Sequence, residues 1–428
     1  MGVFLCLNFV HLQRMRLVYN FIVILTTFLL SLIALFDKKI RLFLAGRKET
    51  FDKLATLKKS DKIIWIHAAS LGEFEQGRPI IEKLKTQHST YKIVLTFFSP
   101  SGYEIRKEYE HADVVCYLPM DTNKNVEKFL NIVNPTLAIF IKYEFWPNYL
   151  HGLKERNIPT ILVSGIFRKN QIFFKHFGGF MRKSLKTFNH FFVQDETSKG
   201  LLKSIQIENV TISGDTRFDR VHEILQQNNS LDFITKFKNN QYTVVAGSTW
   251  KEDEELIVNY INTSNLENEK FIIAPHNINE KDIESLKKSI NKKALLYSEK
   301  EGKNISEFDV FIVDTIGILT KIYAIADAAY IGGGLTKNGV HNVLEPATFS
   351  VPIVIGPEYK KYKEVVDLVA LKGCKVIANQ QEFSAIFTKL KSGKDYREQL
   401  GEINQNFIKN NVGATDLILK YINQKLNN

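Results

Sequence analysis

Short runs of consecutive hydrophobic residues, rich in β-branched side chains, recur through most of the chain and alternate with helix-length stretches of mixed polarity. Near-continuous hydrophobicity over about four to eight residues is typical of strands that are buried on both faces of a sheet. The pattern therefore predicts an α/β protein with parallel sheets covered by helices. A first series of these runs lies at 63–68, 92–98, 114–118, 137–142, 160–164, 191–194 and 210–213, and a second at 242–246, 270–274, 310–313, 328–331, 352–355 and 374–377.

Residues 218–241 separate the two series, and they contain polar clusters rich in Gln and Asn without a strand pattern. A chain of 428 residues also exceeds one ordinary hydrophobic core. The sequence therefore predicts two doubly wound, Rossmann-like domains, at 41–220 and 221–428. Two such domains facing a cleft would bind a ligand at the carboxyl ends of their strands.

An apolar segment near the N-terminus runs from Leu17 to Phe36 without a charged residue. As a helix it would rise about 30 Å, which is enough to cross the hydrocarbon core of a bilayer. A cleaved signal peptide would be shorter and would end in small residues, and a soluble core helix rarely lacks a polar face over this length. Because basic residues follow the segment closely, we predict that residues 1–40 form a single-pass anchor with the body of the protein in the cytoplasm. Translation could begin at Met1 or at Met15.

The net charge of +11 is distributed unevenly along the chain. Residues 1–220 contain 32 basic and 20 acidic residues (+12), whereas residues 221–428 contain 25 and 26 (−1). A uniformly basic nucleic-acid-binding protein is therefore the weaker interpretation, and we predict no nucleic-acid partner. The three cysteines lie far apart, which argues against a disulfide framework or a metal knuckle and favours a reducing compartment.

The first predicted strand ends in a turn of small residues that includes Ser70 and Gly72, and Glu73 follows at the start of the next helix. The free N–H groups of a helix N-terminus favour an anion in this position. Glu73 is therefore a candidate general base, close to where an acceptor hydroxyl would arrive. The simpler alternative is that Glu73 and Glu75 only stabilise the helix dipole. This turn lacks the G-x-G-x-x-G pattern of dinucleotide-binding oxidoreductases.

Two further segments of the first domain have the composition of acceptor-binding loops. Residues 142–148 (KYEFWPN) follow the fourth strand, and there Glu144 could accept hydrogen bonds from hydroxyls while a ring packs on the ligand. Aromatic packing beneath a helix start explains this loop equally well. Residues 156–194 contain no acidic residue and mix bulky apolar side chains with cations that include Arg168 and Lys169. This mixture favours an anionic membrane surface or a phosphorylated lipid, and an amphipathic core helix is the alternative.

Four strand ends of the second domain carry residues suited to phosphate and ribose. Glycine and hydroxyl-bearing turns let backbone N–H groups approach a phosphate, and Asn and Glu three residues apart share one helix face. One glycine-rich loop is weak evidence, but four such strand ends in one domain are stronger. The candidate donor-binding residues are Ser248, Thr249, Pro275, His276, Thr315, Gly317, Gly333, Asn342 and Glu345.

Six motifs, in this order, resemble those of the 3-deoxy-D-manno-octulosonic acid (Kdo) transferases of lipid A. They are SLGE at 70–73, EFWP at 144–147, AGST at 246–249, AP at 274–275, DTIG at 314–317, and GG at 333–334 followed by HNVLEPA at 341–347. The resemblance extends from the anchor to about residue 360. It implies two Rossmann-like halves of the GT-B type at the cytoplasmic face of the inner membrane.

The resemblance also implies an activity, namely inverting transfer of Kdo from CMP-Kdo to a lipid A precursor (lipid IVA) in lipopolysaccharide biosynthesis. It implies that Glu73 is the catalytic base, with Ser70, Gly72, Glu144, Arg168 and Lys169 on the acceptor side. The donor-binding candidates then line the CMP site. Many members of the family carry a basic residue after the Ala-Pro motif, where this chain has His276, so the contact made there is left open.

The sequence contains no Asp-x-Asp motif, so we expect neither a metal nor another cofactor to be required. Two alternatives differ in class from this interpretation. One is another GT-B enzyme that uses a UDP-sugar on a membrane lipid. The other is a non-catalytic binder of anionic lipid, which would leave the ligand-type strand ends of the second domain without a purpose.

Overall fold

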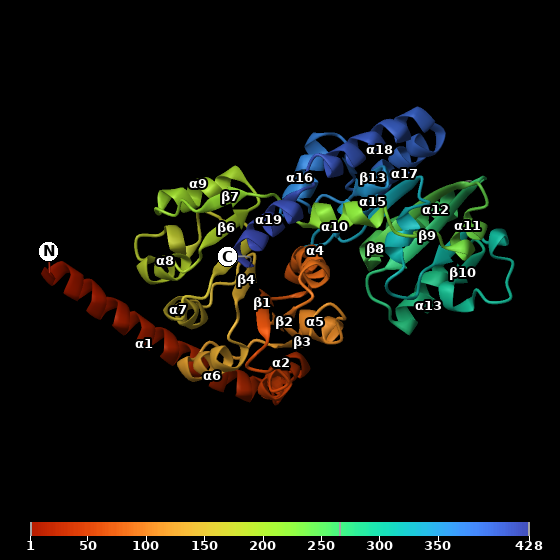
Figure 1. Ribbon diagram of the computed structural model, residues 1–428. Coiled ribbons are helices and arrows are strands. Elements are labelled where there is room, and N and C mark those ends of the chain that lie inside the picture. Colours follow the sequence, from red (N-terminus) through yellow and green to blue (C-terminus); the bar gives the residue numbers. More distant parts are fainter. Residues whose placement is uncertain (1, 265–266, 427–428) are drawn as a thin grey trace. The chain divides into compact units, whose positions relative to one another are not determined.

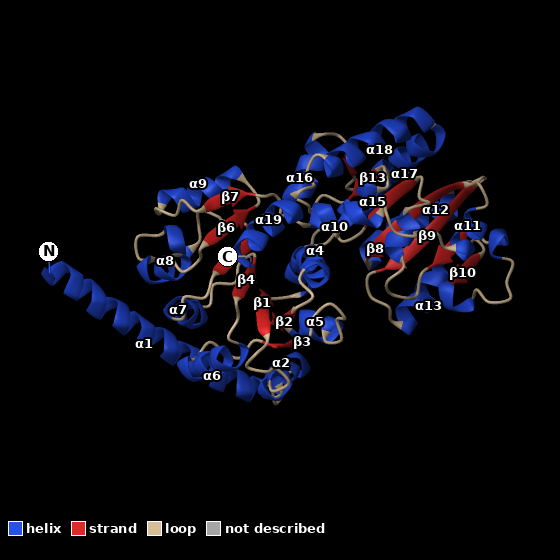
Figure 2. Cartoon of the chain, in the orientation of Figure 1, coloured by secondary structure: helices blue, strands red, loops and turns tan. Residues whose placement is uncertain are grey.

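The structure is a computed structural model that describes residues 2–264 and 267–426, with only the backbone described for residues 2–14. The chain divides into two units (Figures 1 and 2). The first unit comprises the residues up to Arg220 together with those from Val412 onward, and the second comprises Val221–Asn411. Each unit contains one parallel sheet with its own helices, which confirms the predicted α/β fold class.

The sheet of the first unit has seven parallel strands, and each of the seven predicted runs of the first series overlaps one of them. Buried hydrophobic side chains occupy most strand positions, as two-sided burial requires, although the strand at 210–212 is only half-buried. In spatial order the strands are β3 (Val114–Tyr117), β2 (Tyr91–Phe97), β1 (Lys62–Ala68), β4 (Leu137–Ile141), β5 (Thr160–Gly165), β6 (His190–Val193) and β7 (Val210–Ile212).

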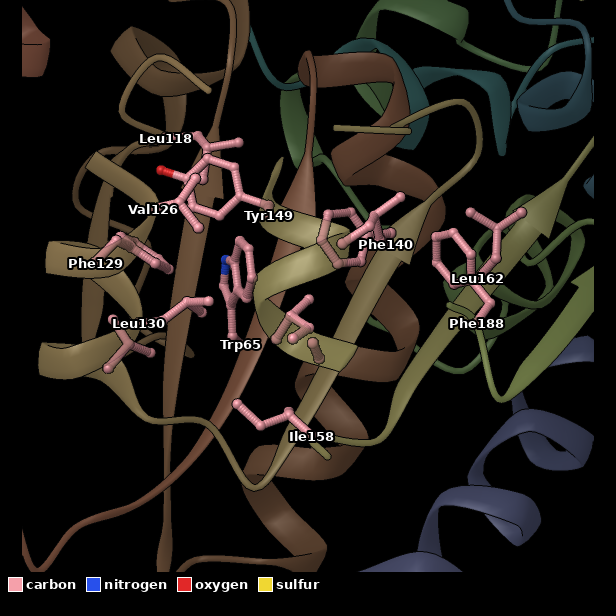
Figure 3. Packing of buried hydrophobic residues seen from close by; sticks show 14 of the residues in the cluster. Trp65, Leu118, Val126, Phe129, Leu130, Phe140, Tyr149, Ile158, Leu162 and Phe188 are labelled. Carbon is pink, nitrogen blue, oxygen red and sulfur yellow. The ribbon is translucent and has the colours of Figure 1, made fainter. Parts of the chain in front are cut away.

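Alternate residues of β1 enter two separate hydrophobic cores, one on each face of the sheet. Trp65 lies in one core, where its ring contacts Phe129, Phe140 and Tyr149 at centroid distances of 4.9, 5.1 and 5.6 Å (Figure 3). The indole N–H of Trp65 donates to Thr96 Oγ1 at 2.9 Å, so its one polar group is satisfied inside the core.

The helices of the first unit cover both faces of its sheet. The core that contains Trp65 receives side chains of α6 and α7, and the opposite core receives those of α4, α5 and α19. The helices are α1 (Gly2–Ile33), α2 (Lys38–Lys48), α3 (Thr50–Leu54), α4 (Leu71–Gln87), α5 (Pro100–Arg106), α6 (Asn123–Val133), α7 (Pro147–Glu155), the 3₁₀ helix η1 (Ile172–Phe174), α8 (Gly179–Leu185), α9 (Glu196–Ser204) and α19 (Ala414–Leu426), and α10 (Arg217–Ile224) crosses the boundary to the second unit.

The sheet of the second unit also has seven parallel strands. Each of the six predicted runs of the second series overlaps one strand. The seventh strand, β10, was not predicted because its three apolar residues are too few to stand out as a run of strand length. In spatial order the strands are β10 (Ala294–Leu296), β11 (Val310–Ile312), β9 (Glu269–Pro275), β8 (Tyr242–Thr249), β12 (Ala328–Ile331), β13 (Ile353–Ile355) and β14 (Cys374–Val376).

The helices of the second unit follow its strands, and α12 and α17 pack together in its core through Tyr260, Phe383 and Phe387. The α-helices are α11 (Asp232–Lys238), α12 (Lys251–Thr263), α13 (Glu280–Ser289), α14 (Leu319–Tyr323), α15 (Leu344–Thr348), α16 (Lys363–Ala370), α17 (Gln380–Ser392) and α18 (Lys394–Lys409), and the 3₁₀ helices are η2 (Tyr297–Glu299) and η3 (Ile305–Glu307).

The C-terminal helix α19 belongs to the first unit, whereas the sequence prediction assigns residues 221–428 to the second. Its apolar face, with Ile418 and Ile422, completes the core beneath α4, and this long-range packing leaves no signal in the local sequence. The buried carboxylate of Asp219 accepts hydrogen bonds from Gly413 N, Thr415 N and Thr415 Oγ1, so it serves as the cap of α19.

The apolar N-terminal segment forms the last part of α1. The stretch Met15–Ile33 is long and apolar enough to cross a membrane, with a mean hydropathy of 1.9, although length and composition are the only evidence for such a crossing. The helix ends at Ile33, shortly before the predicted end at Phe36, because Asp37 caps the next helix by accepting a hydrogen bond from Ile40 N at 2.8 Å.

The cap of α19 gives a direct stability prediction. Asp219→Ala removes a buried acceptor of three hydrogen bonds and should lower the free energy of unfolding by about 2 kcal/mol. The measurement is urea unfolding of the full chain in detergent, followed by far-UV circular dichroism. The matched control is Asp416→Ala, which removes an exposed carboxylate that pairs with Lys83 and should change stability by less than about 0.5 kcal/mol. Equal losses in the two variants would contradict the assigned role of Asp219.

Candidate active site

The strand order reverses at one place in each sheet, and the candidate residues gather there. In the first unit β1 lies between β2 and β4, and in the second unit β8 lies between β9 and β12. At such a point the connections that follow two neighbouring strands run to opposite faces of the sheet. This opens a crevice at the carboxyl ends of these strands. The segments that follow β1 and β4 therefore meet, as do those that follow β8 and β12.

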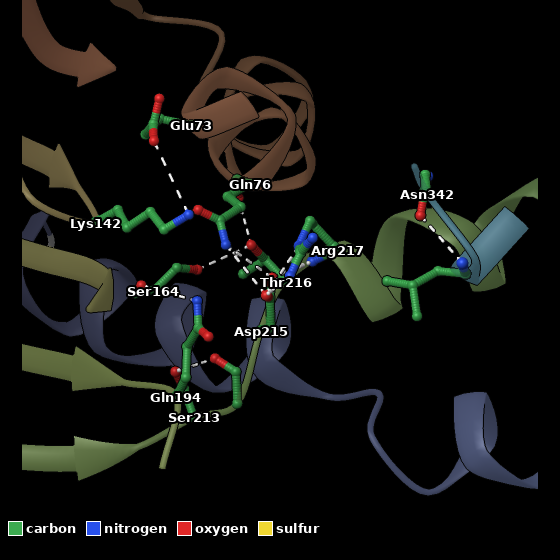
Figure 4. Close-up of polar contacts among 12 residues, drawn as sticks. Glu73, Gln76, Lys142, Ser164, Gln194, Ser213, Asp215, Thr216, Arg217 and Asn342 are labelled. Atoms are coloured by element: carbon green, nitrogen blue, oxygen red, sulfur yellow. Dashed lines mark hydrogen bonds and ion pairs between the residues drawn. The ribbon is translucent and has the colours of Figure 1, made fainter. Parts of the chain in front are cut away.

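Glu73 lies in the first turn of α4, immediately after β1. One carboxylate oxygen accepts a hydrogen bond from Ser70 Oγ. The other is 4.0 Å from Lys142 Nζ at the end of β4, an ion pair that Figure 4 shows. Lys142 adopts a left-handed backbone conformation with φ of 69°, which is uncommon for a residue with a side chain. The carboxylate is thus oriented by a hydroxyl and a cation, and it is about one-sixth exposed (16%), so a substrate hydroxyl could reach it.

Tyr143 connects the Glu73 cluster with the basic segment after β5. The guanidinium of Arg168 lies 5.8 Å from the centre of the Tyr143 ring, and Lys142 Nζ lies 5.3 Å from it. Burial raises the pKa of Tyr143, the positive charge of Arg168 opposes this shift, and the charge of Glu73 adds to it. The acceptor-side candidates Ser70, Glu73 and Arg168 therefore lie around one pair of strand ends. Gly72 is exposed in the same turn of α4, and Lys169 is exposed next to Arg168.

Glu144 is less available for hydrogen bonds to a ligand than the sequence suggests. Its Oε2 accepts a hydrogen bond from Trp146 Nε1 at 2.8 Å and lies 3.1 Å from Nε2 of the fully buried His67. His67 in turn contacts Thr96 through Nδ1. The side chain of Glu144 is only 12% exposed, so it orients the 142–148 loop in addition to any contact with a ligand.

The basic segment 165–183 contributes aromatic side chains to the protein core. This agrees with the alternative interpretation, in which the apolar residues of the segment belong to the core. Phe167 and Phe173 are buried in the same core as Trp65, and Phe174 packs against it. Among the apolar residues of this segment, Ile172 and Phe177 are exposed. The contact with a membrane surface or phosphorylated lipid that the sequence predicts for this segment therefore cannot involve the buried rings of Phe167 and Phe173.

Sequence reasoning missed a polar cluster after β7. The carboxylate of Asp215 accepts hydrogen bonds from Arg217 and from Gln76 Nε2, and Thr216 Oγ1 donates to Gln76 O in α4 (Figure 4). Burial opposes ionisation of Asp215, but Arg217 outweighs it and holds the pKa of this carboxyl below its usual value. The same rule that selected the other strand ends would have found these residues, because they directly follow a short strand.

In the second unit, Asp253 joins the loops after β8 and β12. This buried carboxylate accepts hydrogen bonds from Trp250 N at 2.9 Å, from Gly333 N at 2.8 Å and from the Tyr330 hydroxyl at 2.7 Å. Burial raises the pKa of Asp253, and these donors oppose the shift. Gly333 has φ of 88°, in the left-handed region that glycine tolerates best. Asp253 therefore fixes the glycine-rich loop, a role that its sequence neighbourhood does not reveal.

The other donor candidates gather around these two loops. Thr249 O accepts a hydrogen bond from His276 N, which joins the ends of β8 and β9. Ser248 lies at a register irregularity of β8 with φ of 54°. Glu345 accepts hydrogen bonds from Asn342 Nδ2 at 2.9 Å and from Thr320 Oγ1 at 2.6 Å. Thr320 belongs to α14, and the loop before that helix carries Thr315 and the exposed Gly317. The last donor candidate, Pro275, is the final residue of β9.

Two histidines and a tryptophan stack beside Gly333. The rings of His276 and His341 are 4.4 Å apart, and the Trp250 ring stacks on that of His276 at 4.7 Å. Trp250 Nε1 donates to His341 Nε2 at 2.9 Å, so this nitrogen carries no proton. Burial, with a smaller effect of His276, lowers the pKa of His341 to about 4, and burial lowers the pKa of His276. The stack is thus an uncharged surface at neutral pH.

A cavity of about 620 Å³ borders Thr249 and Pro275 on the side of α12 and α13. Its lining includes the three carboxylates of Glu254, Glu255 and Asp282 and a single cation, Lys251. A cavity of this charge is unsuited to a phosphate. The side of the loops that carries the histidine stack and Gly333 is therefore the better candidate for an anionic ligand. Among the described residues, no group of three or more His, Cys, Asp or Glu side chains is arranged to hold a metal ion.

The lowered pKa of His341 predicts a pH dependence of stability. An unfolded chain protonates this histidine near pH 6.5, whereas the folded protein does so only near pH 4, so protons favour the unfolded state between these values. The urea midpoint of the full chain should therefore fall less between pH 7 and pH 5 in His341→Gln than in the unmodified protein. Trp250→Phe removes the donor to His341 Nε2, so it should also reduce the pH dependence. An unchanged pH dependence in His341→Gln would contradict the assignment.

Residues 45–220 match the sequence model of a family described as 3-deoxy-D-manno-octulosonic-acid transferase (Kdo transferase). A 3-deoxy-D-manno-octulosonic acid transferase of Haemophilus influenzae is 27% identical over 379 residues, which are 83% of this chain and 85% of that protein. A bifunctional glycosyltransferase/methyltransferase of Fusobacterium nucleatum is 27% identical over 376 residues, or 85% of this chain. The chain spans only 57% of the length of that relative.

Among solved structures, that of UDP-GlcNAc 2-epimerase from Neisseria meningitidis bound to UDP-GlcNAc matches with a TM-score of 0.59. The match covers 85% of this chain and 100% of that chain at 13% identity. At this identity the likeness shows the fold alone, and it supports the predicted GT-B type. The resemblance to the Kdo transferases rests instead on the family match over residues 45–220 and on the curated relatives, which confirm it.

Proposed function

We propose that the protein is a glycosyltransferase that moves Kdo from CMP-Kdo to a lipid A precursor, lipid IVA, in lipopolysaccharide biosynthesis. The observation that carries this proposal is the position of Glu73. It lies at the reversal point of the first sheet, is held by Ser70 and Lys142, and belongs to the segment that matches the Kdo transferase family.

The proposed reaction inverts the configuration at the anomeric carbon. A hydroxyl oxygen of the acceptor attacks that carbon, its proton passes to the Glu73 carboxylate, and the bond between the anomeric carbon and the phosphate oxygen breaks to release CMP. A positioned base of this kind typically contributes about 10²- to 10⁴-fold to the rate. Lys142 would bind the anionic acceptor, with Arg168 and Lys169 in the same role.

We assign the CMP moiety to the second unit. The glycine-rich loop held by Asp253 allows close approach of a phosphate, and the flat histidine stack offers a surface on which a base ring can pack. Glu345, already oriented by Asn342 and Thr320, suits the hydroxyls of a ribose. A UDP-sugar would fit the same features of the second unit, so the preference for CMP-Kdo rests on the family resemblance.

We also propose that the protein acts at the cytoplasmic face of the inner membrane and is attached to it through α1. A lipid acceptor with long acyl chains stays in the bilayer, so the enzyme must come to the surface where the sugar is displayed. Exposed cations near α1, such as Lys38, Lys39 and Arg41, suit an anionic lipid surface.

The base assignment is tested with Glu73→Gln, which keeps the shape of the side chain but cannot accept the proton. We expect at least about a 100-fold lower transfer rate with unchanged CMP binding. The assay is mass spectrometry of the product from lipid IVA and CMP-Kdo, with parallel incubations with UDP-sugars. Glu75→Gln is the matched control, because Glu75 pairs with Arg78 and Arg106 on the surface of α4 and should leave the rate close to wild type. An active Glu73→Gln enzyme would refute the proposed base.

We further propose that transfer needs no divalent metal, since cations of the protein and N–H groups can stabilise the leaving phosphate. Dialysis of the enzyme against EDTA should therefore leave the transfer rate unchanged, and added Mg²⁺ should not raise it. The measurement is the same product assay. A loss of activity that Mg²⁺ restores would overturn this proposal and leave the base assignment standing.

A further inference from the structure

The apolar helix α1 presents two different faces. Its outward face carries large exposed hydrophobic side chains at helical spacing, namely Leu17, Phe21, Leu25, Phe28 and Leu32, which are between 44% and 70% exposed. Neighbouring residues such as Val18 and Leu29 widen this stripe. Exposed apolar residues that form one continuous stripe indicate a surface that is covered by something else.

The opposite face of α1 carries polar groups that bind the first unit. Arg16 Nε donates to Asn148 Oδ1 at 3.3 Å, and Arg16 NH2 donates to Asn123 Oδ1 at 3.1 Å. One helical turn further on, the Tyr19 hydroxyl donates to Asp121 Oδ2 at 2.8 Å, and Asn20 Oδ1 accepts a hydrogen bond from Asn148 Nδ2 at 2.9 Å. These contacts fasten the start of the apolar stretch to the loop before α6 and to α7.

The end of the apolar stretch lies against the same unit. Thr27, Ser31 and Ala34 line a cavity of about 450 Å³ together with residues of α2 and of the 119–125 segment. Arg41 of α2 donates to Ala34 O and Leu35 O. From Arg16 to Ala34 a helix rises about 27 Å, nearly the thickness of a bilayer core, so the whole candidate span runs beside one domain.

These contacts conflict with a helix that crosses the bilayer. Asp121 is 1% exposed and also accepts from Asn148 N and Tyr149 N, so it is part of the folded body of the unit. If α1 crossed the membrane with its contacts intact, this carboxyl group and its polar neighbours would lie in hydrocarbon, where ionisable groups are strongly disfavoured. A helix that lies along the membrane surface keeps all of them on the aqueous side.

The cations near both ends of the apolar stretch of α1 also favour a position on one side of the membrane. Arg16 lines a cavity with Lys154 and Lys183, whose ammonium groups have no hydrogen-bond or ion-pair partner within the described residues. Lys38 and Arg41 are exposed at the other end. Basic residues are enriched on the cytoplasmic side of a membrane, and a helix in the plane of the membrane leaves both groups on that side.

We propose that α1 lies in the plane of the membrane, with its outward stripe inserted into one leaflet of anionic phospholipid, and that it does not cross the bilayer. This replaces the single-pass anchor expected from the sequence. The proposal does not depend on the identity of the donor or acceptor, so its failure would leave the proposed Kdo transfer untouched.

The depth of the outward face in a bilayer distinguishes the two arrangements. Nitroxide labels are placed singly at Val18→Cys, Leu25→Cys and Leu32→Cys, which lie seven residues apart on one face, in full-length protein with Cys6→Ser. Cys116 and Cys374 are buried and should not react. Lys288→Cys, on an exposed helix of the second unit, is the aqueous control. The protein is reconstituted in vesicles of phosphatidylethanolamine and phosphatidylglycerol, and accessibility to oxygen and to a water-soluble nickel chelate gives each depth.

For a helix in the membrane plane, the three labels should lie at similar depths of about 5–10 Å. For a crossing helix, Leu25 should lie near the bilayer centre, and the outer labels, each about 10 Å away along the axis, should lie near opposite interfaces. That gradient would overturn the proposal. Low accessibility of the labels to oxygen would also overturn the proposal. The stripe would then be covered by protein, such as a second copy of the chain, and not by lipid.

The side of the membrane on which the N-terminus lies provides an independent measurement that needs no change within α1. An N-terminal fusion to green fluorescent protein should fluoresce, and a fusion to alkaline phosphatase should be inactive, because both reporters remain in the cytoplasm. An active phosphatase fusion would place the N-terminus across the membrane and refute the proposal.

Discussion

The parallel pairing of β1 with β4 in the first unit, and of β8 with β12 in the second, is the constraint on which the candidate residues of each unit depend. Each pair joins strands that are distant in sequence, and each marks the place where the order of its sheet reverses. Because parallel strands end at the same edge, the segments that follow them must meet. Glu73 and Lys142 are neighbours for this reason, and so are Trp250 and Gly333. If either pairing were lost, the residues of that half would keep their local structure but lose their common position.

Buried carboxylates hold the chain segments that these pairings bring together. Asp253 connects the loops after β8 and β12 through two backbone N–H groups, and Asp219 attaches the C-terminal helix to the first unit in the same way. A carboxylate accepts several hydrogen bonds at once, so one side chain can satisfy donors from separate segments. Asp121 does this at the junction with α1, where the donors come from α7 and from Tyr19. The loops are therefore positioned by groups that do not themselves face a substrate.

The sequence was sufficient for the strands and for most strand-end residues, because burial on both faces leaves long apolar runs whose ends are easily located. Glu73, Ser248 and Gly333 could be selected in this way. Contacts between distant segments were not predictable, since nothing near Lys142 indicates that it faces Glu73. The same limit explains why the sequence places α19 in the second domain, whereas its contacts place it in the first unit. The strand β10 was not predicted because it has only three residues. For α1, the composition indicated a helix that crosses a membrane. The sequence alone did not show that polar side chains of this helix, such as Arg16 and Tyr19, bind the first unit.

We relate the uneven charge of the chain to its two proposed ligands, a membrane surface for the first half and a single small ligand for the second. A membrane presents many anionic groups over a wide area, and only a spread of cations can match it, such as Lys38, Arg41 and Lys183 around α1. A nucleotide presents one phosphate to a small site, where oriented neutral donors suffice and mobile lysines would bring little selectivity. The neutral histidine stack and the glycine-rich loop of the second unit are of this kind, and that half of the chain has a net charge of only −1 from 25 basic and 26 acidic residues. If α1 attaches the protein to a membrane as proposed, the surplus of positive charge belongs with the half of the chain that carries α1, whichever sugar is transferred.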